Sequence, residues 1–381
     1  MTAPTPSPRR SSSGDSGTQV LHLERDHHDK ALSTVLKGFF PEASWGEVKR
    51  WIARRLIQVN GNLCLDPGRR MRAGDVVKRL AQPLPKPVDA DDIRVVHIDP
   101  HLIIVEKPAG ITSVRHVAEK ELPPRRKQLQ PTLDELLPQV LARELHLPWP
   151  AAGAHNRGGR KRPGKGGRHG NHKQEIVSRK RLPPALRVYP VHRLDRDTSG
   201  LMVFARTSPS QQRLMAMFRR HAVRREYLAV CHGCVEPQTI DTTLVRDRGD
   251  GLRGTLLPGM VDPRPDLAQR AITHVIAAEP IGSPPAFSLI RCQLETGRTH
   301  QIRIHLAEIG HPICGEPLYR RLPDGTTIAD TSGAPRQALH AHRMALHHPM
   351  TGERLEFHMP MPRDLAAWML RLRRQEEQGE S

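Results

Sequence analysis

The run HRLDRDTSGL at His192–Leu201 is the most informative part of this sequence. It is polar, and it lies between the apolar residues that end at Val191 and the apolar run Leu201–Phe204. A polar loop between two buried segments is a good place to hold a carboxylate in a fixed position. Asp195 alone, however, would more often be a turn or capping residue, so the rest of the chain has to decide its role.

Outward from this loop, the hydrophobic periodicity predicts many strands and few helices. After the strand Leu201–Ala205, we expect strands at Arg225–His232, Thr239–Val245, Ala271–Ala277, Phe287–Leu294, Gln337–Leu346 and Arg354–His358, and helices at Pro209–Arg220, Thr299–Ile309 and Arg363–Arg374. Upstream, Ile93–Glu106 predicts two strands around an Asp99-Pro100 turn. Ser208 is the expected N-cap of the first helix. Together these elements predict an α+β fold with a mixed, mostly antiparallel sheet.

The same run resembles the H-R-L-D-x-x-T-S-G loop of RluA-type RNA pseudouridine synthases. Three further stretches are similar to motifs of that family in the same order: Ile103–Gly110 to its K-P-x-G turn, Arg225–Ala229 to its K/R-x-Y-x-A strand, and Leu294–Arg303, followed by Gly310–Tyr319, to its T-G-R-x-H-Q-[IL]-R segment. Four ordered motifs at compatible spacing are a specific signal, and the match covers roughly 93–115 and 186–362. The resemblance implies the family's fold, an RNA isomerase activity and no cofactor.

The resemblance also implies roles for individual residues. Asp195 takes the position of the catalytic carboxylate, Tyr227 that of the active-site ring, and Arg298 that of the guanidinium that pairs with Asp195. Isomerising uridine breaks the N1–C1′ bond and rejoins the base through C5, which needs no redox change. An ionised carboxylate can serve as a nucleophile or as a base that removes a sugar proton, and the sequence leaves both routes open.

Four further residues are expected to bind the substrate. A base inside folded RNA must first be flipped out of its stack. By resemblance, Arg193 would fill the vacated stack with help from His192, and Ile302 would supply an apolar wall. Lys107, in the K-P-x-G turn, completes the expected binding set.

The N-terminal part of the chain predicts a separate small α+β domain. Apolar spacing favours helices at Ser33–Phe40 and Trp45–Leu56, the second capped by Ser44. Ile57–Gly61 is a strand that runs into an Asn-Gly turn. This unit resembles the S-four-type RNA-binding domain. We therefore expect a disordered tail at 1–17, the RNA-binding domain at 18–82, a proline-rich linker at 83–92 and the catalytic domain at 93–375.

The charge balance predicts a polyanionic partner. The 381 residues hold 59 basic and 40 acidic side chains, a net charge of +19, which favours nucleic acid first and an anionic membrane surface second. Asn156–Arg181 carries ten Lys and Arg against one Glu, and it lies in an expected insertion at 116–184. Within that insertion a helix is possible near Thr132–Glu144, although Pro138 would kink or split it.

Other features set limits on the class of protein. No run of about 18 apolar residues is present, so a membrane span is not predicted. Five scattered cysteines favour a reducing cytoplasm over a disulfide framework. Cys231-His-Gly-Cys234 has no second pair nearby, so no metal site is predicted. His340 and His342 share one face of a strand and are expected at the surface or facing RNA.

Several functional alternatives remain open at this stage. Large-subunit ribosomal RNA is the expected substrate, because similar two-domain members of the family act there, and transfer RNA is the alternative. The protein is expected to act as a monomer. A second hypothesis is a non-catalytic RNA-binding ribosome-assembly factor with the same fold. A third is a metal-dependent nuclease that uses Asp195, Asp197 and histidines.

Overall fold

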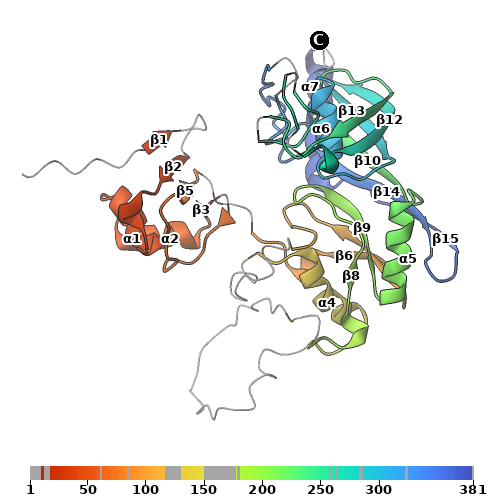
Figure 1. Ribbon diagram of the computed structural model, residues 1–381, viewed down its shortest axis with the longest axis horizontal. Coiled ribbons are helices and arrows are strands. Elements are labelled where there is room, and N and C mark those ends of the chain that lie inside the picture. Colours follow the sequence, from red (N-terminus) through yellow and green to blue (C-terminus); the bar gives the residue numbers. More distant parts are fainter. Residues whose placement is uncertain are drawn as a thin grey trace, which may run out of the picture. The chain divides into compact units, whose positions relative to one another are not determined.

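The chain divides into two compact units, residues 1–87 and 88–381 (Figure 1). The computed structural model describes residues 10–12, 18–60, 62–81, 83, 86–115, 130–149, 177, 181–249, 251–257, 259–262, 264–282, 286–321 and 325–379. The boundary falls earlier than the expected domain start at 93, because Ala90 and Ile93 are already buried in the core of the second unit.

The first unit is a five-stranded sheet with two helices. Its strands are β1 (Arg10–Ser12), β2 (Gln19–His22), β3 (Ile57–Val59), β4 (Asn62–Leu63) and β5 (Val76–Arg79), in the order β1-β2-β5-β3-β4. Both predicted helices are present, as α1 (Leu32–Phe39) and α2 (Trp45–Ala53), and Ser44 caps α2 as expected. Within the stretch 1–17 that was expected to be a tail, residues 10–12 form β1 and pair with β2.

The second unit is built on a ten-stranded sheet. Its strands are β6 (Arg94–Ile98), β7 (Leu102–Lys107), β8 (Tyr189–Pro190), β9 (Ser199–Ala205), β10 (Arg224–His232), β11 (Gln238–Leu244), β12 (Gln269–Ile281), β13 (Phe287–Leu294), β14 (Leu339–His347) and β15 (Arg354–His358). The main order is β11-β12-β13-β10-β14-β9-β7-β6, with β15 on β14 and β8 on β9. Among the described strand pairs of this sheet, only β14 with β9 is parallel. The predicted α+β, mostly antiparallel architecture is confirmed.

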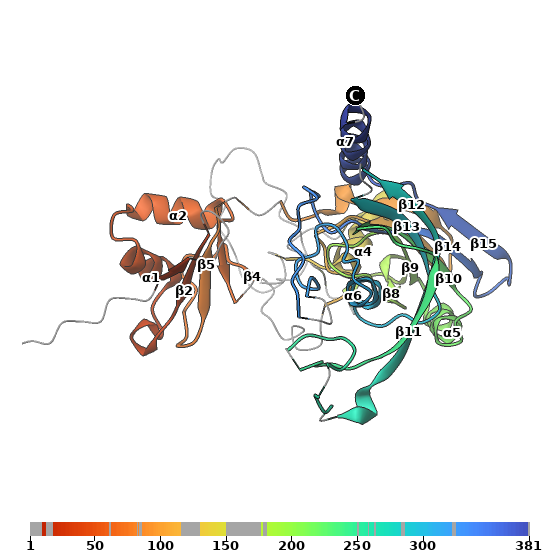
Figure 2. The same cartoon turned by 90° about the horizontal axis from the view of Figure 1, so that it is seen from above.

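Helices cover both faces of this sheet (Figure 2). On one face lie α4 (Leu133–Glu144), α6 (Gln301–Glu308) and α7 (Arg363–Gly379), and on the other lies α5 (Ser208–Arg219). The side chains of β9 point alternately to the two faces. Met202 and Phe204 pack on the side of α4, α6 and α7, while Leu201 and Val203 pack on the side of α5. Because β9 is buried on both faces, the polar loop before it has a rigid support.

Helix α5 begins one residue earlier than predicted. The Thr207 hydroxyl, rather than that of Ser208, accepts the hydrogen bond from the Ser210 backbone N–H, at 3.3 Å. Ser208 and Pro209 are then the first two helical residues, where the missing N–H of proline costs nothing.

Helix α4 belongs to the core rather than to an insertion. Leu133, Leu137 and Val140 are fully buried in the main cluster, and Pro138 lies inside a helix that continues past it. Arg115 donates to both carboxylate oxygens of Glu135, at 2.8 and 2.6 Å. Part of the expected insertion at 116–184, residues 133–142, thus packs in the core of the second unit. The basic segment 156–181, except 177 and 181, lies outside the described residues.

Gly200, at the start of β9, lies where the backbones of β9 and β14 approach closely. Its φ is +118°, and an added Cβ would lie 2.3 Å from the carbonyl oxygen of Ala341 on the parallel strand β14. We expect Gly200→Ala to lower the free energy of unfolding by about 3 kcal/mol, from overlap and backbone strain together. Gly110→Ala is the matched control, because its φ is +86° but nothing lies within 4 Å. Equal thermal stability of the two variants would contradict this.

Candidate active site

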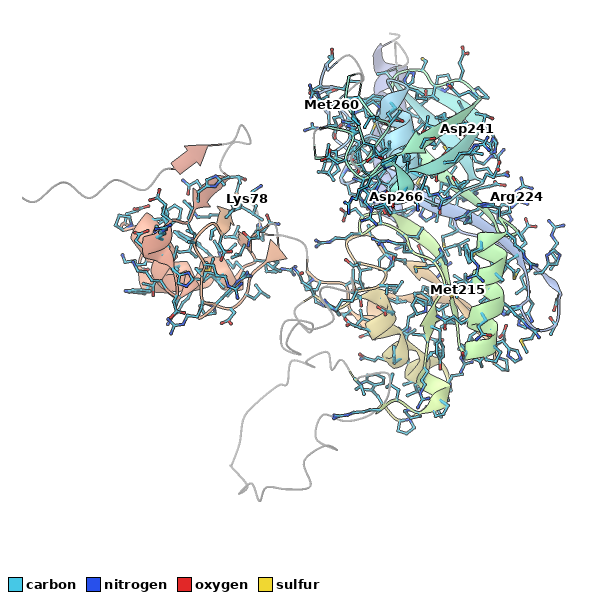
Figure 3. The ribbon with its side chains drawn as sticks, viewed as in Figure 1. Lys78, Met215, Arg224, Asp241, Met260 and Asp266 are labelled. Atoms are coloured by element: carbon cyan, nitrogen blue, oxygen red, sulfur yellow. The ribbon has the colours of Figure 1, made fainter. Side chains whose placement is uncertain are left out.

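Asp195 lies in a cavity of about 410 Å³ in the second unit. Three regions form its walls: the loop that contains Asp195, the C-terminal half of α5 with Met215 (Figure 3), and the turn at 297–300 that leads into α6. Tyr227 on β10 and Ile302 on α6 add buried surface. The cavity thus brings together residues from three of the four motifs, the H-R-L-D loop, the K/R-x-Y strand and the T-G-R-x-H-Q segment, which are far apart in the sequence.

The Asp195 carboxylate pairs with Arg303. The Nη1 of Arg303 donates to Oδ2 of Asp195 at 3.2 Å, while its Nε and Nη2 donate to the two oxygens of Glu316, both at 2.7 Å. The side chain of Glu316 has no exposed surface, whereas that of Asp195 is 16% exposed. Burial alone would lower the pKa of Arg303, but Glu316 and Asp195 raise it above its ordinary value. A charged guanidinium therefore faces the Asp195 carboxylate in the wall of the cavity.

The expected pairing of Asp195 with Arg298 was wrong. Arg298 does line the cavity, but its Nε donates to the carbonyl oxygen of Arg270 at 3.0 Å. The physical reason is local: α6 begins at Gln301, which turns Arg303 inward in the first turn of the helix. Both arginines belong to the same motif. What distinguishes Arg303 is its partner Glu316, which lies in the downstream Gly310–Tyr319 stretch and accepts two hydrogen bonds from it.

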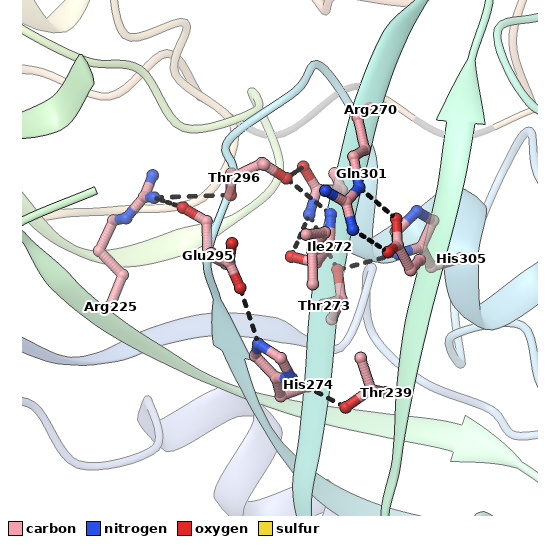
Figure 4. A network of polar contacts seen from close by, with 11 residues as sticks. Arg225, Thr239, Arg270, Ile272, Thr273, His274, Glu295, Thr296, Gln301 and His305 are labelled. Carbon is pink, nitrogen blue, oxygen red and sulfur yellow. Dashed lines mark hydrogen bonds and ion pairs between the residues drawn. The ribbon is translucent and has the colours of Figure 1, made fainter. Parts of the chain in front are cut away.

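The amide of Gln301 fixes the turn that leads into α6 (Figure 4). Its Oε1 accepts from the Thr296 hydroxyl at 2.7 Å and from the Arg298 backbone N–H at 2.9 Å. Its Nε2 donates to the Ile272 carbonyl and the Thr273 hydroxyl, both at 2.9 Å. All four hydrogen-bonding positions of the amide are therefore used, which makes the turn rigid.

His300 stands at the end of this turn, and sequence reasoning assigned it no role. Its Nδ1 lies 2.7 Å from the Tyr319 hydroxyl, and its Nε2 lies 3.9 Å from Oδ1 of Asp195. Its φ is +61°, an uncommon backbone conformation for a residue other than glycine. Burial lowers the pKa of His300, against a smaller opposing effect of Asp195. The motif T-G-R-x-H-Q contained this residue, but only the fold brings it to Asp195.

Tyr227 lies in the cavity, as expected, with only 6% of its surface exposed. Burial raises the pKa of its hydroxyl, while the nearby Arg225 guanidinium acts in the opposite direction. Arg225 donates to the carbonyl oxygens of Glu295 and Thr296, at 3.3 and 3.5 Å (Figure 4). Ile302 lines the same cavity, so that the Tyr227 ring and this aliphatic side chain both offer apolar surface to a planar ligand.

His192 and Arg193 both line the cavity, but the His192 side chain is held in place while the Arg193 side chain is exposed. The Nε2 of His192 accepts a hydrogen bond from the Val203 backbone N–H at 3.0 Å, and its ring stacks on Phe218 with centroids 4.6 Å apart. Burial lowers the pKa of His192 to about 3, so the ring is neutral. Arg193 is exposed. His192 is therefore part of the wall, and Arg193 is free to meet a ligand.

Lys107 is fully buried and lies behind the loop rather than in the cavity. Its Nζ donates to the carbonyl oxygens of Pro108, Arg196 and Thr198, at 3.1, 2.9 and 2.7 Å. Burial lowers the pKa of Lys107 to about 7, although Asp197 and Asp195 act against this. Lys107 was expected to bind substrate, but the structure places its side chain outside the lining of the cavity. Its three hydrogen bonds tie the backbone that follows Asp195, at Arg196 and Thr198, to the turn at Pro108.

Comparison with known proteins decides the family. Residues 101–308, more than half of the chain, match the family described as RNA pseudouridylate synthase. The chain belongs to this family. It is 32% identical over 346 residues to ribosomal large subunit pseudouridine synthase D of Neisseria meningitidis, covering 88% of this chain and 76% of that protein. The enzyme of the same name from Escherichia coli K12 is 30% identical over 347 residues, covering 88% of both chains.

The protein is thus an RNA pseudouridine synthase, an isomerase, as its sequence indicated. Within the described ranges, no three His, Cys, Asp or Glu side chains gather where they could hold a metal ion. Cys231 is buried and Cys234 is exposed. In the part of the chain that the structure describes, no helix is long and apolar enough to cross a membrane.

His340 corrects another expectation about this synthase. It was expected at the surface, yet its side chain is fully buried, and its Nδ1 lies 3.0 Å from the Ser199 hydroxyl at the end of the active-site loop. Burial lowers the pKa of His340 to about 4, so this neutral ring braces the loop. His342 is only partly buried, and its Nδ1 hydrogen-bonds to the Met359 carbonyl.

Lys107→Met tests how far the synthase depends on support from behind the loop. Methionine fills the space but leaves three carbonyls without their donor, which should lower the free energy of unfolding by about 3 kcal/mol. Turnover should also fall, because two of those carbonyls belong to the loop residues that directly follow Asp195. Arg196→Ala is the control, since that exposed side chain only reaches the Gly110 carbonyl. A Lys107→Met protein with normal thermal stability and turnover would show that the loop needs no such support.

Proposed function

We propose that Asp195 is the catalytic carboxylate of this synthase and that its cavity receives the target uridine. The Asp195–Arg303–Glu316 chain carries this proposal. A catalytic carboxylate must be charged, fixed and reachable. Arg303 is a charged hydrogen-bond donor that fixes the direction of this carboxylate, while the 16% exposed side chain of Asp195 opens into the cavity.

The cavity walls suit a nucleobase. A uracil stacked on Tyr227 would gain about 1–3 kcal/mol, which offsets part of the few kcal/mol needed to flip it out. Ile302 would contact the opposite side of the base, and exposed Arg193 would occupy the gap left in the RNA stack. This assigns recognition of the target to the walls and bond-making to Asp195.

In the reaction, the N1–C1′ glycosidic bond breaks, the uracil turns within the cavity, and C5 bonds to C1′. Asp195 can act as a nucleophile on the sugar or as a base that removes a sugar proton. Both routes require a carboxylate that is not protonated and not displaced by water. The buried guanidinium of Arg303 holds the carboxylate in place, by donating to its Oδ2 at 3.2 Å.

We further propose that the substrate is large-subunit ribosomal RNA, bound with help from the first unit. The two relatives described above carry that substrate in their names, and the match extends over 88% of this chain. The small α+β unit at the N-terminus, which resembles an S-four-type RNA-binding domain, supplies a set of exposed cations. They are Lys49, Arg50, Arg54, Arg70 and Arg72. Such side chains bind phosphates without reading sequence.

Transcripts of ribosomal and transfer RNA test this assignment. The full chain is incubated with each RNA, and pseudouridine is mapped by carbodiimide labelling and primer extension. We expect modification of large-subunit ribosomal RNA that is unchanged by EDTA once the RNA is folded. Modification of transfer RNA alone would overturn the substrate assignment. RNA binding without product would favour an assembly factor, and strand cleavage blocked by EDTA would favour a nuclease.

A further inference from the structure

The last step of the isomerisation needs a proton acceptor. Once C5 has bonded to C1′, it still carries its hydrogen, and the uracil ring has a C6=N1 double bond. The C5–H bond must then break, its electron pair must form the C5=C6 double bond, and N1 must take up a proton. The same bonds break and form in this step whether Asp195 acts as a nucleophile or as a base. The enzyme must therefore hold a base beside the uracil.

We propose that His300 is this base, with Nε2 as the atom that accepts the proton from C5. The proposal rests on the assignment of the Asp195 cavity as the active site. His300 lines that cavity, and its Nε2 is 3.9 Å from the Asp195 carboxylate. When Nδ1 donates its hydrogen to the Tyr319 oxygen 2.7 Å away, Nε2 keeps a free lone pair. Water, as the general acid, then supplies the proton that N1 takes up.

The surroundings of His300 suit a change between neutral and charged forms. The charged or titratable groups that face it are Asp195, Arg303, Glu316, Arg193 and Tyr319. Burial lowers the pKa of His300, so the ring is neutral and able to accept at pH 7. After it accepts the proton, the imidazolium is stabilised by the Asp195 carboxylate 3.9 Å away. It can then pass the proton to solvent, because the side chain is 27% exposed.

Two other groups in the cavity are weaker candidates. The Tyr227 hydroxyl has a pKa raised by burial, so its phenolate form is scarce at neutral pH. The Asp195 carboxylate already accepts a hydrogen bond from Arg303 through Oδ2. The backbone of His300 supports the choice as well. A φ of +61° costs about 1–2 kcal/mol in a residue other than glycine, and such strain is maintained where position matters.

Deuterium at C5 of the target uridine tests the proposal. His300→Asn is the main variant, because asparagine adopts this backbone conformation readily and can still bond to Tyr319, but its amide cannot accept the proton. We expect turnover to fall about 10²-fold or more. The variant should also work more slowly on deuterated than on ordinary RNA, because removal of the C5 hydrogen has become rate-limiting. Tyr319→Phe leaves the His300 backbone untouched and should show the same isotope effect with a smaller loss.

Three outcomes would overturn the proposal. One is normal turnover of His300→Asn; the second is a slow His300→Asn enzyme with no deuterium effect, which is the mark of a merely structural loss. The third is an isotope effect that appears in Tyr227→Phe and not in His300→Asn. Failure of this inference is distinct from failure of the active-site assignment, which would show as product formation by Asp195→Asn.

Discussion

Replacing Asp195 by asparagine is expected to reduce turnover by at least about 10³-fold. Asparagine has the same shape and can still accept the hydrogen bond from Arg303, but its amide is neither a nucleophile nor a base. Because the side chain is partly exposed, the loss of charge should alter the free energy of unfolding by only about 1 kcal/mol. RNA affinity should be retained, since the cavity walls and the exposed cations are unchanged.

The measurement is pseudouridine formed per enzyme on ribosomal RNA, together with the dissociation constant for the same RNA. Asp197→Asn is the matched control, because it lies in the same loop but outside the cavity lining. We expect it to retain turnover within about tenfold, or 1.4 kcal/mol. If Asp195→Asn still turned over and Asp197→Asn did not, the catalytic role would move to Asp197.

The sequence predicted the sheet well because burial imposes a period that can be read directly. Phe287–Leu294 and Arg354–His358 have the predicted bounds, as β13 and β15. The sequence also indicated the α4 helix, but it did not indicate that this helix packs in the core. Its core position depends on Leu133, Leu137 and Val140 packing against strands that are distant in the sequence.

Residue types and motifs predicted which segments form the candidate site, but not which contacts each side chain makes there. Asp195 and Tyr227 do share one cavity, as the motifs implied. Two arginines of one motif cannot be told apart by spacing, so Arg298 was chosen over Arg303. Lys107 was misplaced for a similar reason: a lysine in a turn is normally solvated, and only the three carbonyls around it explain its burial.

Arg303 is expected to show the largest combined loss of stability and activity. Arg303→Gln leaves the carboxylate of Glu316 buried without its bidentate partner, although the backbone N–H groups of Leu318 and Tyr319 still donate to it, at 2.9 and 3.2 Å. Removing one member of a buried ion pair costs about 3–5 kcal/mol of unfolding free energy. Turnover should fall with it, since Asp195 loses the cation that holds it. Thermal unfolding and the ribosomal RNA assay measure the two effects on the same samples.

A second substitution separates the two effects. In the double variant Arg303→Gln with Glu316→Gln, no buried charge is left unpaired and two amides can hydrogen-bond, so much of the stability should return. Turnover should stay low, because Asp195 still faces no guanidinium. Recovery of turnover along with stability would mean that Arg303 only supports the fold. Arg298→Ala completes the comparison: it should change the unfolding free energy by less than about 0.5 kcal/mol. A loss of turnover in Arg298→Ala as large as in Arg303→Gln would return the pairing role to the residue that the sequence suggested.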